Sequence, residues 1–340
     1  MASAPKTVCI VGVAGFIGSH LLEKIIRERA WNVIGIDMVA PTKIQQLLGA
    51  EKKWASRFEF HQMNIVTGGS ELNALIARSD VVINLAAICN PSEYIKQPVN
   101  TINSNFTDAQ DCIKYCVEHD KHLIHFSTCE VYGRTLASYG LPADDPQNYI
   151  LDEETTPMIM GPVSAQRWCY ACAKQLVERL IYAHGTENNL KFTIVRPYNW
   201  IGPRMDYIPG VDGKDDGQPR VLASFMTALM KGEPLVLVNG GEVFRTFCFV
   251  EDAVESVGQP SSHSPDHRSS LPAACPAVGQ PAGPLARSPA RSPARPPARP
   301  PARPLARSPA RSPACLAAEI ESRSRWPLRS NRCVRGRSCA

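Results

Sequence analysis

Tyr170 and Lys174 are four residues apart, a spacing that places a phenol and an ammonium group on the same face of a helix. A phenol normally ionises at about pH 10, and a positive charge beside it favours the phenolate. The pair therefore predicts a general base that removes a proton from a substrate hydroxyl near neutral pH. Because Tyr-x-x-x-Lys is a common pattern, its weight depends on other groups that converge with it.

Thr128 and Glu130, both in the segment Ser127–Gly133, are candidates to converge with this pair. This segment follows a predicted strand, and ligands of open α/β sheets bind at the carboxyl ends of strands. Thr128 is expected to hydrogen-bond the substrate hydroxyl, and Glu130 offers a second proton acceptor. The alternative is a buried Thr128 bonded to backbone and a solvated Glu130.

A glycine-rich turn supplies a candidate cofactor site. Gly12, Gly15 and Gly18 follow one predicted strand, and Phe16 and Ile17 begin the helix after it. Glycines allow a tight turn and a close approach of the backbone to a pyrophosphate, which then lies at the positive end of the helix. The order strand, turn and helix predicts a dinucleotide-binding site.

Asp37 ends the second predicted strand, 19 residues after Gly18. A carboxylate there accepts hydrogen bonds from the adenosine ribose and repels a 2′-phosphate, so the sequence predicts NAD rather than NADP. Lys174 is expected also to hold the nicotinamide ribose. Asn64 could bond the adenine amino group or serve only as a turn residue. Further residues expected to line the cofactor are Ile65, Leu85, Ala86 and Ala87.

Short apolar runs alternate with helical patterns, which predicts an α/β fold: a Rossmann-type, doubly wound parallel sheet. The predicted strands are Thr7–Val13, Asn32–Asp37, Arg57–Met63, Val81–Ala86, His122–Ser127 and Lys191–Pro197. The predicted helices between them are Phe16–Arg29, Ser70–Ala77, Val99–His119 and Ser164–Gly185. After these come a helix near Arg220–Lys231 and short strands at Leu235–Val238 and Thr246–Val250.

Composition divides the chain. Residues 258–340 hold 14 Arg against 3 acidic residues and 16 of the 29 Pro, with Arg at every fourth position from Arg287 to Arg311. Residues 1–257 hold 23 basic and 29 acidic residues. We therefore expect an NAD-binding Rossmann domain over 1–197, including the catalytic helix, a partial substrate-binding lobe over 198–257, and a disordered tail over 258–340.

Several classes of protein are disfavoured. The chain opens directly on a strand pattern rather than a signal peptide, and no run approaches the ~20 apolar residues of a membrane span. The cysteines do not form the two CxxC pairs that are typical of a zinc site. We therefore expect free thiols, no metal and a cytoplasmic protein. Basic residues gather only in the tail, so we expect no nucleic-acid partner.

The run from Gly12 to about Glu255 resembles the extended short-chain dehydrogenase/reductase family. Thr128, Tyr170 and Lys174 together resemble the catalytic triad of that family. Motifs at 86–91, 127–133, 166–168 and 196–204 resemble the group of UDP-glucuronate decarboxylases and plant UDP-apiose/UDP-xylose synthases. This resemblance implies an enzyme that decarboxylates UDP-glucuronate with NAD through a 4-keto sugar. The product is UDP-apiose, UDP-xylose or both.

The resemblance also implies roles for further residues. Ring contraction to apiose needs proton transfers beyond the triad, for which Glu130, Cys89 and Cys129 are candidates, because a thiol titrates near pH 8.5. For each cysteine the alternative is a small buried hydrophobe. The residues expected to bind the UDP-sugar are Tyr94, Arg167, Asn199, Arg204, Arg220 and Arg245. Pairing of helices Val99–His119 and Ser164–Gly185 across a homodimer is implied as well.

Beyond about Glu255 the resemblance stops, whereas the family continues. We therefore expect uncovered apolar surface, poor solubility and weak or absent turnover of the chain as written. The competing interpretations are a UDP-xylose-only decarboxylase or another sugar-nucleotide epimerase or dehydratase, and a catalytically impaired NAD-binding or tail-mediated interaction protein. Dehydratases have an acid where Cys129 stands, which argues against them.

Overall fold

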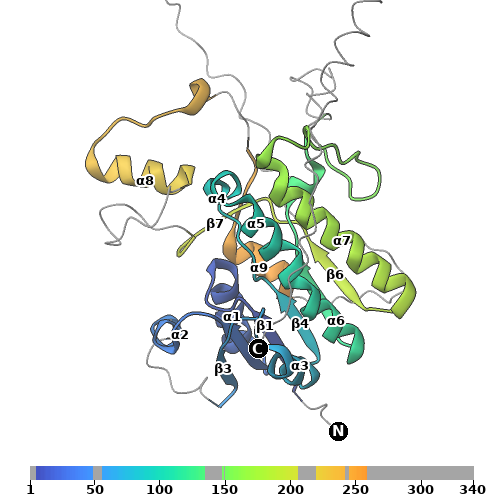
Figure 1. Ribbon diagram of the computed structural model, residues 1–340. Coiled ribbons are helices and arrows are strands. Elements are labelled where there is room, and N and C mark those ends of the chain that lie inside the picture. The colour runs from blue at the N-terminus through green and yellow to red at the C-terminus, as the bar shows by residue number, and fades with distance from the viewer. Residues whose placement is uncertain are drawn as a thin grey trace, which may run out of the picture. The chain divides into compact units, whose positions relative to one another are not determined.

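A computed structural model describes residues 5–48, 56–134, 148, 150–205, 220–241 and 245–258 (Figure 1). Its strands are β1 Thr7–Val11, β2 Asn32–Asp37, β3 Phe58–Gln62, β4 Val81–Asn84, β5 His122–Phe126, β6 Phe192–Val195, β7 Asn199–Ile201 and β8 Phe247–Phe249. Its α-helices are α1 Phe16–Glu28, α2 Pro41–Leu48, α3 Gly69–Ala77, α4 Pro91–Lys96, α5 Pro98–Asn105, α6 Gln110–Glu118, α7 Cys169–Asn188, α8 Val221–Lys231 and α9 Val250–Gly258.

In the described part of the chain, β1 to β6 form one parallel sheet in the order β3-β2-β1-β4-β5-β6. The chain runs outward from β1 to β3 and then returns to the other side of β1 at β4. This reversal creates a crevice at the carboxyl ends of β1 and β4, where ligands of doubly wound folds bind. The predicted Rossmann-type fold is confirmed.

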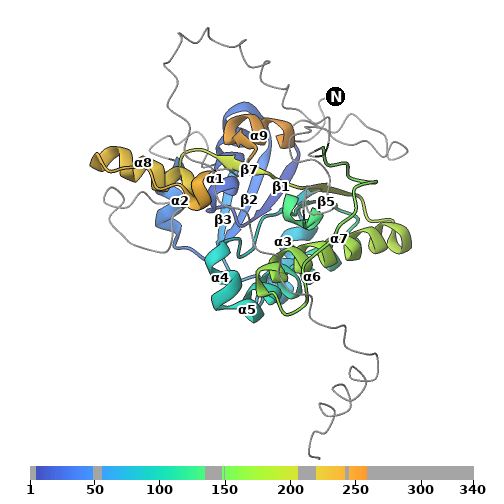
Figure 2. The same ribbon diagram turned by 90° about the horizontal axis from the view of Figure 1, so that it is seen from above.

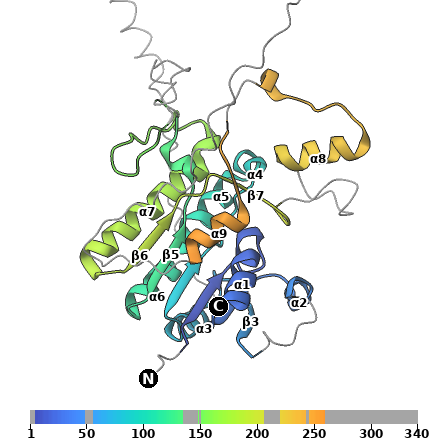
Figure 3. The same cartoon turned by 180° about the vertical axis from the view of Figure 1, so that it is seen from behind.

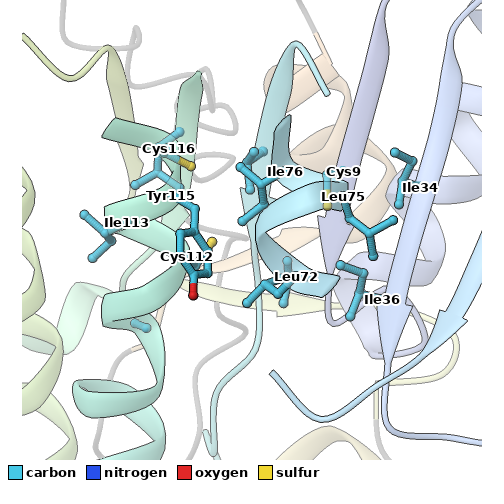
Figure 4. Close-up of a cluster of buried hydrophobic side chains, with 14 of the residues drawn as sticks. Cys9, Ile34, Ile36, Leu72, Leu75, Ile76, Cys112, Ile113, Tyr115 and Cys116 are labelled. Atoms are coloured by element: carbon cyan, nitrogen blue, oxygen red, sulfur yellow. The ribbon is translucent and has the colours of Figure 1, made fainter. Parts of the chain in front are cut away.

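Helices cover both faces of the sheet because alternate side chains of each strand point in opposite directions. Val8 and Ile10 of β1 belong to a core shared with α1 and α9, whereas Cys9 belongs to a core shared with α3, α6 and α7. Figure 4 shows Cys9 among the latter, and Figure 3 shows α9 beside α1. The buried strands therefore carry the continuous apolar runs that the sequence shows.

Two predicted elements differ in the structure. The helix expected over Val99–His119 is divided into α5, a short 3₁₀ turn and α6, because Phe106 leaves helical geometry at φ −122° and ψ −64°. The strand expected at Leu235–Val238 is wrong: irregular backbone leads into a 3₁₀ turn over Val238–Gly241. Gly240 and Gly241 have φ of 73° and 75° there, a conformation that no strand adopts.

The described residues after β6 form two different kinds of structure. Val250 and Val254 of α9 are buried against α1, so this segment packs on the six-stranded sheet and its helices rather than apart from them. β7 and β8 pair in a separate two-stranded sheet. The domain boundary at residue 197 stays a prediction, and the predicted tail, 258–340, lies almost wholly outside the described residues.

α8 buries little of its apolar surface. Ala223 is its one buried residue, whereas Val221, Met226, Leu229 and Met230 are exposed. An amphipathic helix normally places such side chains against a neighbour. The apolar surface that we expected to be uncovered is therefore present on this helix.

Candidate active site

The glycine turn is formed as predicted and requires its glycines. Gly12 has φ 87°, and its N–H donates to the carbonyl of Ile36 at 2.8 Å. A Cβ at Gly18 would lie 2.2 Å from the Gly12 carbonyl oxygen, so only glycine allows α1 to start this close to β1. A Cβ at Gly12 would lie 3.1 Å from the amide nitrogen of Ala86, which places the end of β4 against the turn.

Asp37 faces the same turn from the end of β2. Its Oδ2 accepts a hydrogen bond from the Ala14 N–H at 2.9 Å, and its Oδ1 accepts one from the Val39 N–H at 3.3 Å. The carboxylate is thus fixed beside the turn, where an adenosine ribose is expected to bind. Asn64 uses its side chain to accept from the Val66 N–H at 3.0 Å, a local turn contact.

Thr128, Tyr170 and Lys174 converge at the carboxyl end of β5. The Thr128 side chain lies close enough to the Tyr170 phenol to lower its pKa, and its hydroxyl accepts a hydrogen bond from the Glu130 N–H at 3.2 Å. Lys174 Nζ donates to the carbonyl of Phe126, the last residue of β5, at 2.8 Å. All three side chains are buried. The sequence spacing of Tyr170 and Lys174 therefore does place both groups on the face of α7 that covers this strand end.

The expected effect of Lys174 on the Tyr170 phenol is not what the structure shows. Burial raises the pKa of Tyr170, and the nearby Cys89 and Glu130 raise it further, while the Thr128 side chain lowers it. Burial lowers the pKa of Lys174 from 10.5 to about 8. The prediction that Lys174 makes Tyr170 a phenolate near neutral pH is therefore wrong for the protein alone, because burial disfavours the charged form of the phenol.

Tyr94, for which a contact with the sugar or uracil stays a prediction, stacks on Tyr170. The two ring centroids are 4.7 Å apart and the planes differ by 9°. Cys169, which the sequence analysis did not single out, donates its thiol hydrogen to the Tyr94 carbonyl with a sulfur–oxygen distance of 3.5 Å. Its position directly before Tyr170 was the only signal available. This cluster fixes the Tyr170 ring by packing on one face.

Glu130 and two cysteines surround the Tyr170 phenol. Burial raises the pKa of Glu130, and Arg167, 3.9 Å away, opposes that rise. Burial raises the pKa of Cys129 to about 11, away from the neutral range that we expected for a proton-transferring thiol. Cys89 is exposed, and its proximity raises the pKa of both Tyr170 and Lys174. Glu130 is therefore better suited than Cys129 to accept a proton.

The six candidate substrate-binding residues fall into two groups. Arg167, Arg220 and Arg245 act on the site. Arg167 lies over the Trp168 ring and faces Glu130. Burial raises the pKa of Tyr94 and of Cys129, and Arg220 and Arg245, respectively, oppose these rises. Tyr94 belongs to the Tyr170 cluster described above. The remaining two, Asn199 and Arg204, have other partners.

Arg204 binds Glu23 of α1 through two hydrogen bonds of 3.1 and 2.8 Å. It lines a cavity of about 290 Å³ beside the glycine turn, together with Ala14, Gly15, Phe16, Ser19, Lys43 and Gln46. Asn199 donates to the Thr246 carbonyl at 2.8 Å and so joins β7 to β8. In this structure neither residue points to the Tyr170 cluster.

Comparisons with known proteins agree with this arrangement. The model of the NAD dependent epimerase/dehydratase family matches residues 8–259. The chain is 54% identical over 259 residues to UDP-D-apiose/UDP-D-xylose synthase 2 of Arabidopsis thaliana, covering 74% of this chain and 66% of the relative. It is also 54% identical to the UDP-D-apiose/UDP-D-xylose synthase of Oryza sativa, covering 75% and 65%. The chain thus spans slightly less than two thirds of these relatives.

Solved structures give the same fold. The PbgP3 protein from Burkholderia pseudomallei is 33% identical, with a TM-score of 0.61 over 75% of this chain and 70% of that one. A UDP-glucuronic acid 4-epimerase from Bacillus cereus, solved with UDP-glucuronic acid and NAD, is 24% identical, with a TM-score of 0.55 over 74% and 71%. Among the described residues no helix is long and apolar enough to cross a membrane. The chain belongs to the NAD dependent epimerase/dehydratase family.

Proposed function

We propose that this protein acts on UDP-glucuronate with NAD, removing carbon dioxide through a 4-keto sugar and forming UDP-apiose, UDP-xylose or both. The observation that carries the proposal is the convergence of Thr128, Tyr170 and Lys174 beside Glu130 and Cys89 at one strand end. The 54% identity to plant UDP-D-apiose/UDP-D-xylose synthases supports the same reaction.

The residues at the glycine turn fit NAD. Gly12 and Gly18 allow a tight turn because a Cβ at either position would press on neighbouring backbone, and the turn opens α1, whose N-terminus favours a pyrophosphate. Asp37 is held against the turn, where it can accept from ribose hydroxyls and exclude a 2′-phosphate. Lys174 would hold the nicotinamide ribose. When bound, NAD supplies a hydride acceptor for oxidation of the sugar and a donor for the closing reduction.

The protein's own residues handle the protons of this oxidation. Thr128 and Tyr170 would receive the substrate hydroxyl. Because Tyr170 is a neutral phenol in the protein alone, it would take the hydroxyl proton, as the carbonyl forms at carbon 4, only after passing its own phenol proton to another base, for which Glu130 is the candidate. The sugar is then a β-keto acid, which loses carbon dioxide readily. Arg167 presents a guanidinium beside this cluster and would orient the substrate carboxylate.

Glu130 and Cys89 favour the branch that leads to apiose over a xylose-only enzyme. Ring contraction requires proton transfers beyond those of Tyr170, and both groups act electrostatically on its phenol. Burial raises the pKa of Glu130, which suits a group that must both accept and release a proton. Cys129 is the weaker candidate because burial raises its pKa to about 11.

We further propose a homodimer through α5 and α7, which lie side by side (Figure 2). Val99 of α5 is 70% exposed, and Leu176 and Tyr182 of α7 are 49% and 58% exposed. A second copy would cover these side chains with its own equivalent helices. Sedimentation velocity of the full chain should show a dimer that Val99→Glu dissociates. A monomer at all concentrations would disprove the dimer without touching the proposed chemistry.

Product analysis tests the reaction. The full 340-residue chain is incubated with NAD and UDP-glucuronate, and nucleotide sugars are identified by mass spectrometry. We expect UDP-apiose or UDP-xylose, lost by at least ~100-fold in Tyr170→Phe and retained in Tyr115→Phe, whose ring lies in the core that includes α6 rather than in the Tyr170 cluster. Formation of an epimerised or dehydrated sugar instead would contradict the proposal.

A second candidate is NAD binding with little or no turnover, favoured by the exposed apolar side chains of α8. Calorimetric titration of the same chain with NAD separates the two. NAD binding without product would support this candidate, and product formation would exclude it.

A further inference from the structure

A buried guanidinium joins three segments around the catalytic cluster. Arg196, which follows β6, donates from Nε and Nη2 to the two carboxylate oxygens of Glu178 at 3.1 and 2.6 Å. Its Nη1 donates to the Tyr132 hydroxyl at 2.9 Å, and the guanidinium carbon lies 4.9 Å from the centre of the Tyr132 ring. The Arg196 and Glu178 side chains are 12% and 4% exposed. We call these three residues the clamp.

The clamp connects the two halves of the catalytic set. Glu178 lies on α7 one helical turn after Lys174, and both side chains are buried. Tyr132 ends the 3₁₀ turn Cys129–Tyr132, which begins directly after Thr128 and carries Glu130. Arg196 therefore holds the helix that carries Tyr170 and Lys174 against the turn that carries their partners.

Stability alone is a weak reason to bury this ion pair. Removing two charges from water costs as much as their attraction returns, and apolar residues of similar size often serve as well in such places. The bidentate geometry does, however, fix one distance and one orientation between the segments that it joins. A clamp at this position suits a site whose groups must be held in register.

Glu178 also acts on Lys174. Its carboxylate raises the pKa of that ammonium, opposing the larger lowering caused by burial. The other groups around Lys174 are Cys89, which raises its pKa, and His125 of β5, whose own pKa burial and Lys174 hold well below the usual value. His125 is thus neutral, and Glu178 is the carboxylate that supports a charged Lys174.

We propose that Arg196, Glu178 and Tyr132 are positioning residues: the clamp sets α7 against the Cys129–Tyr132 turn, and the Glu178 carboxylate keeps the buried Lys174 ammonium charged for binding the cofactor ribose. The ribose contact rests on the proposed function. The position and charge state of Lys174 do not rest on the proposed function, and both can be measured without turnover.

The test follows Lys174 by NMR in the full chain. With ¹³C-labelled lysine, the Lys174 side-chain signal is assigned as the one missing in Lys174→Met and is titrated between pH 6 and about 10. We expect Glu178→Gln to lower the pKa of Lys174 by about one unit or more. Glu187→Gln, an exposed glutamate on the same helix, should leave it unchanged.

A double variant separates positioning from folding. Glu178→Gln leaves Arg196 buried without its partner and can fail to fold, whereas Arg196→Met with Glu178→Met replaces the whole pair by apolar side chains. We expect the double variant to fold and still to show the lowered pKa of Lys174. In parallel, its affinity for NAD should fall by about tenfold at pH 8, where more Lys174 is neutral.

The outcomes are distinct. If Lys174 titrates alike in the wild type and the folded double variant, the ion pair is only structural and the proposal is overturned. If the wild type binds no NAD, the proposed function fails, while the Lys174 titration still decides the clamp. Tyr132→Phe should speed amide hydrogen exchange over residues 129–132 with little effect on Lys174, and unchanged exchange would remove Tyr132 from the clamp.

Discussion

The glycine turn and α8 differ in how strongly the rest of the fold supports them. The turn is fixed by hydrogen bonds from the Gly12 N–H to the Ile36 carbonyl of β2 and from the Ala14 N–H to the Asp37 carboxylate. It lies at the end of a strand whose side chains are buried on both faces. α8 is a regular helix closed by Gly232 in the left-handed conformation, yet one of its side chains alone is buried. A segment can thus be well formed locally and have little tertiary support.

This difference matters because the two regions would serve the two halves of the proposed reaction. The turn would bind the cofactor, and Arg220, which precedes α8, acts on Tyr94 in the catalytic cluster. We therefore expect mutations to disturb cofactor binding less than they disturb the part of the reaction that depends on α8. Four measurements can break or sharpen this comparison.

The largest contrast should come from truncating one apolar side chain in each region. Ile113 of α6 is fully buried in the core shared with β1, so Ile113→Ala should lower the free energy of unfolding by ~2–5 kcal/mol. Met230→Ala on α8 should change it by less than ~0.5 kcal/mol, because Met230 is exposed. Urea unfolding followed by circular dichroism measures both. Equal losses would mean that α8 is packed after all.

The second measurement concerns Lys174, whose pKa burial lowers from 10.5 to about 8. The folded protein releases this proton near pH 8, whereas the unfolded chain keeps it to pH 10.5, so the Lys174 contribution to stability rises with pH between these values. A shift of this size corresponds to about 3 kcal/mol. Below pH 8 the wild type carries the full cost of the buried charge.

Lys174→Met should therefore be more stable than the wild type at pH 7, with the difference shrinking as the pH approaches 10. Urea unfolding of both proteins at several pH values shows this directly, and titrating cysteines and tyrosines cancel in the comparison. A constant difference across the range would show that Lys174 is neutral or well solvated in the folded state.

The regions also differ in how far the sequence could predict them. Strand Asn32–Asp37 and the turn at Gly12–Gly18 were predicted because short-range spacing decides them. The partners of Arg204 and Tyr94 were not, because they come from Glu23 and Tyr170, far away in the chain. A local motif predicts which residue has a functional role, whereas tertiary packing decides which residues it contacts.

Charge state was the hardest property to predict. The spacing of Tyr170 and Lys174 was interpreted correctly as placing both on one helix face, yet the pKa of the phenol is raised. Burial of both side chains depends on strands and helices contributed by the whole fold, which no four-residue pattern contains. The role of Arg196 was missed for the same reason, since its partners Glu178 and Tyr132 lie 18 and 64 residues away.

The third measurement tests the glycine turn itself. Gly18→Ala would place a Cβ 2.2 Å from the Gly12 carbonyl oxygen, a backbone clash that should cost ~1–3 kcal/mol and displace the start of α1. Gly15→Ala is the matched control, because its Cβ would lie 3.4 Å from that same oxygen. Thermal unfolding should separate the two variants clearly. Similar midpoints would show that the turn tolerates a side chain at Gly18.

The smallest expected effect is on cofactor choice. Asp37→Asn keeps an oxygen that can accept from the Ala14 N–H but removes the charge that would repel a 2′-phosphate. We expect the preference for NAD over NADP to fall by about tenfold, or ~1.4 kcal/mol, with little change in stability. Calorimetric titration with each dinucleotide measures the ratio, and Asp80→Asn, at the amino end of the sheet beside Thr7, is the control. If the ratio is unchanged in Asp37→Asn, discrimination comes from elsewhere, and the cavity lined by Lys43 and Arg204 becomes the place to look for it.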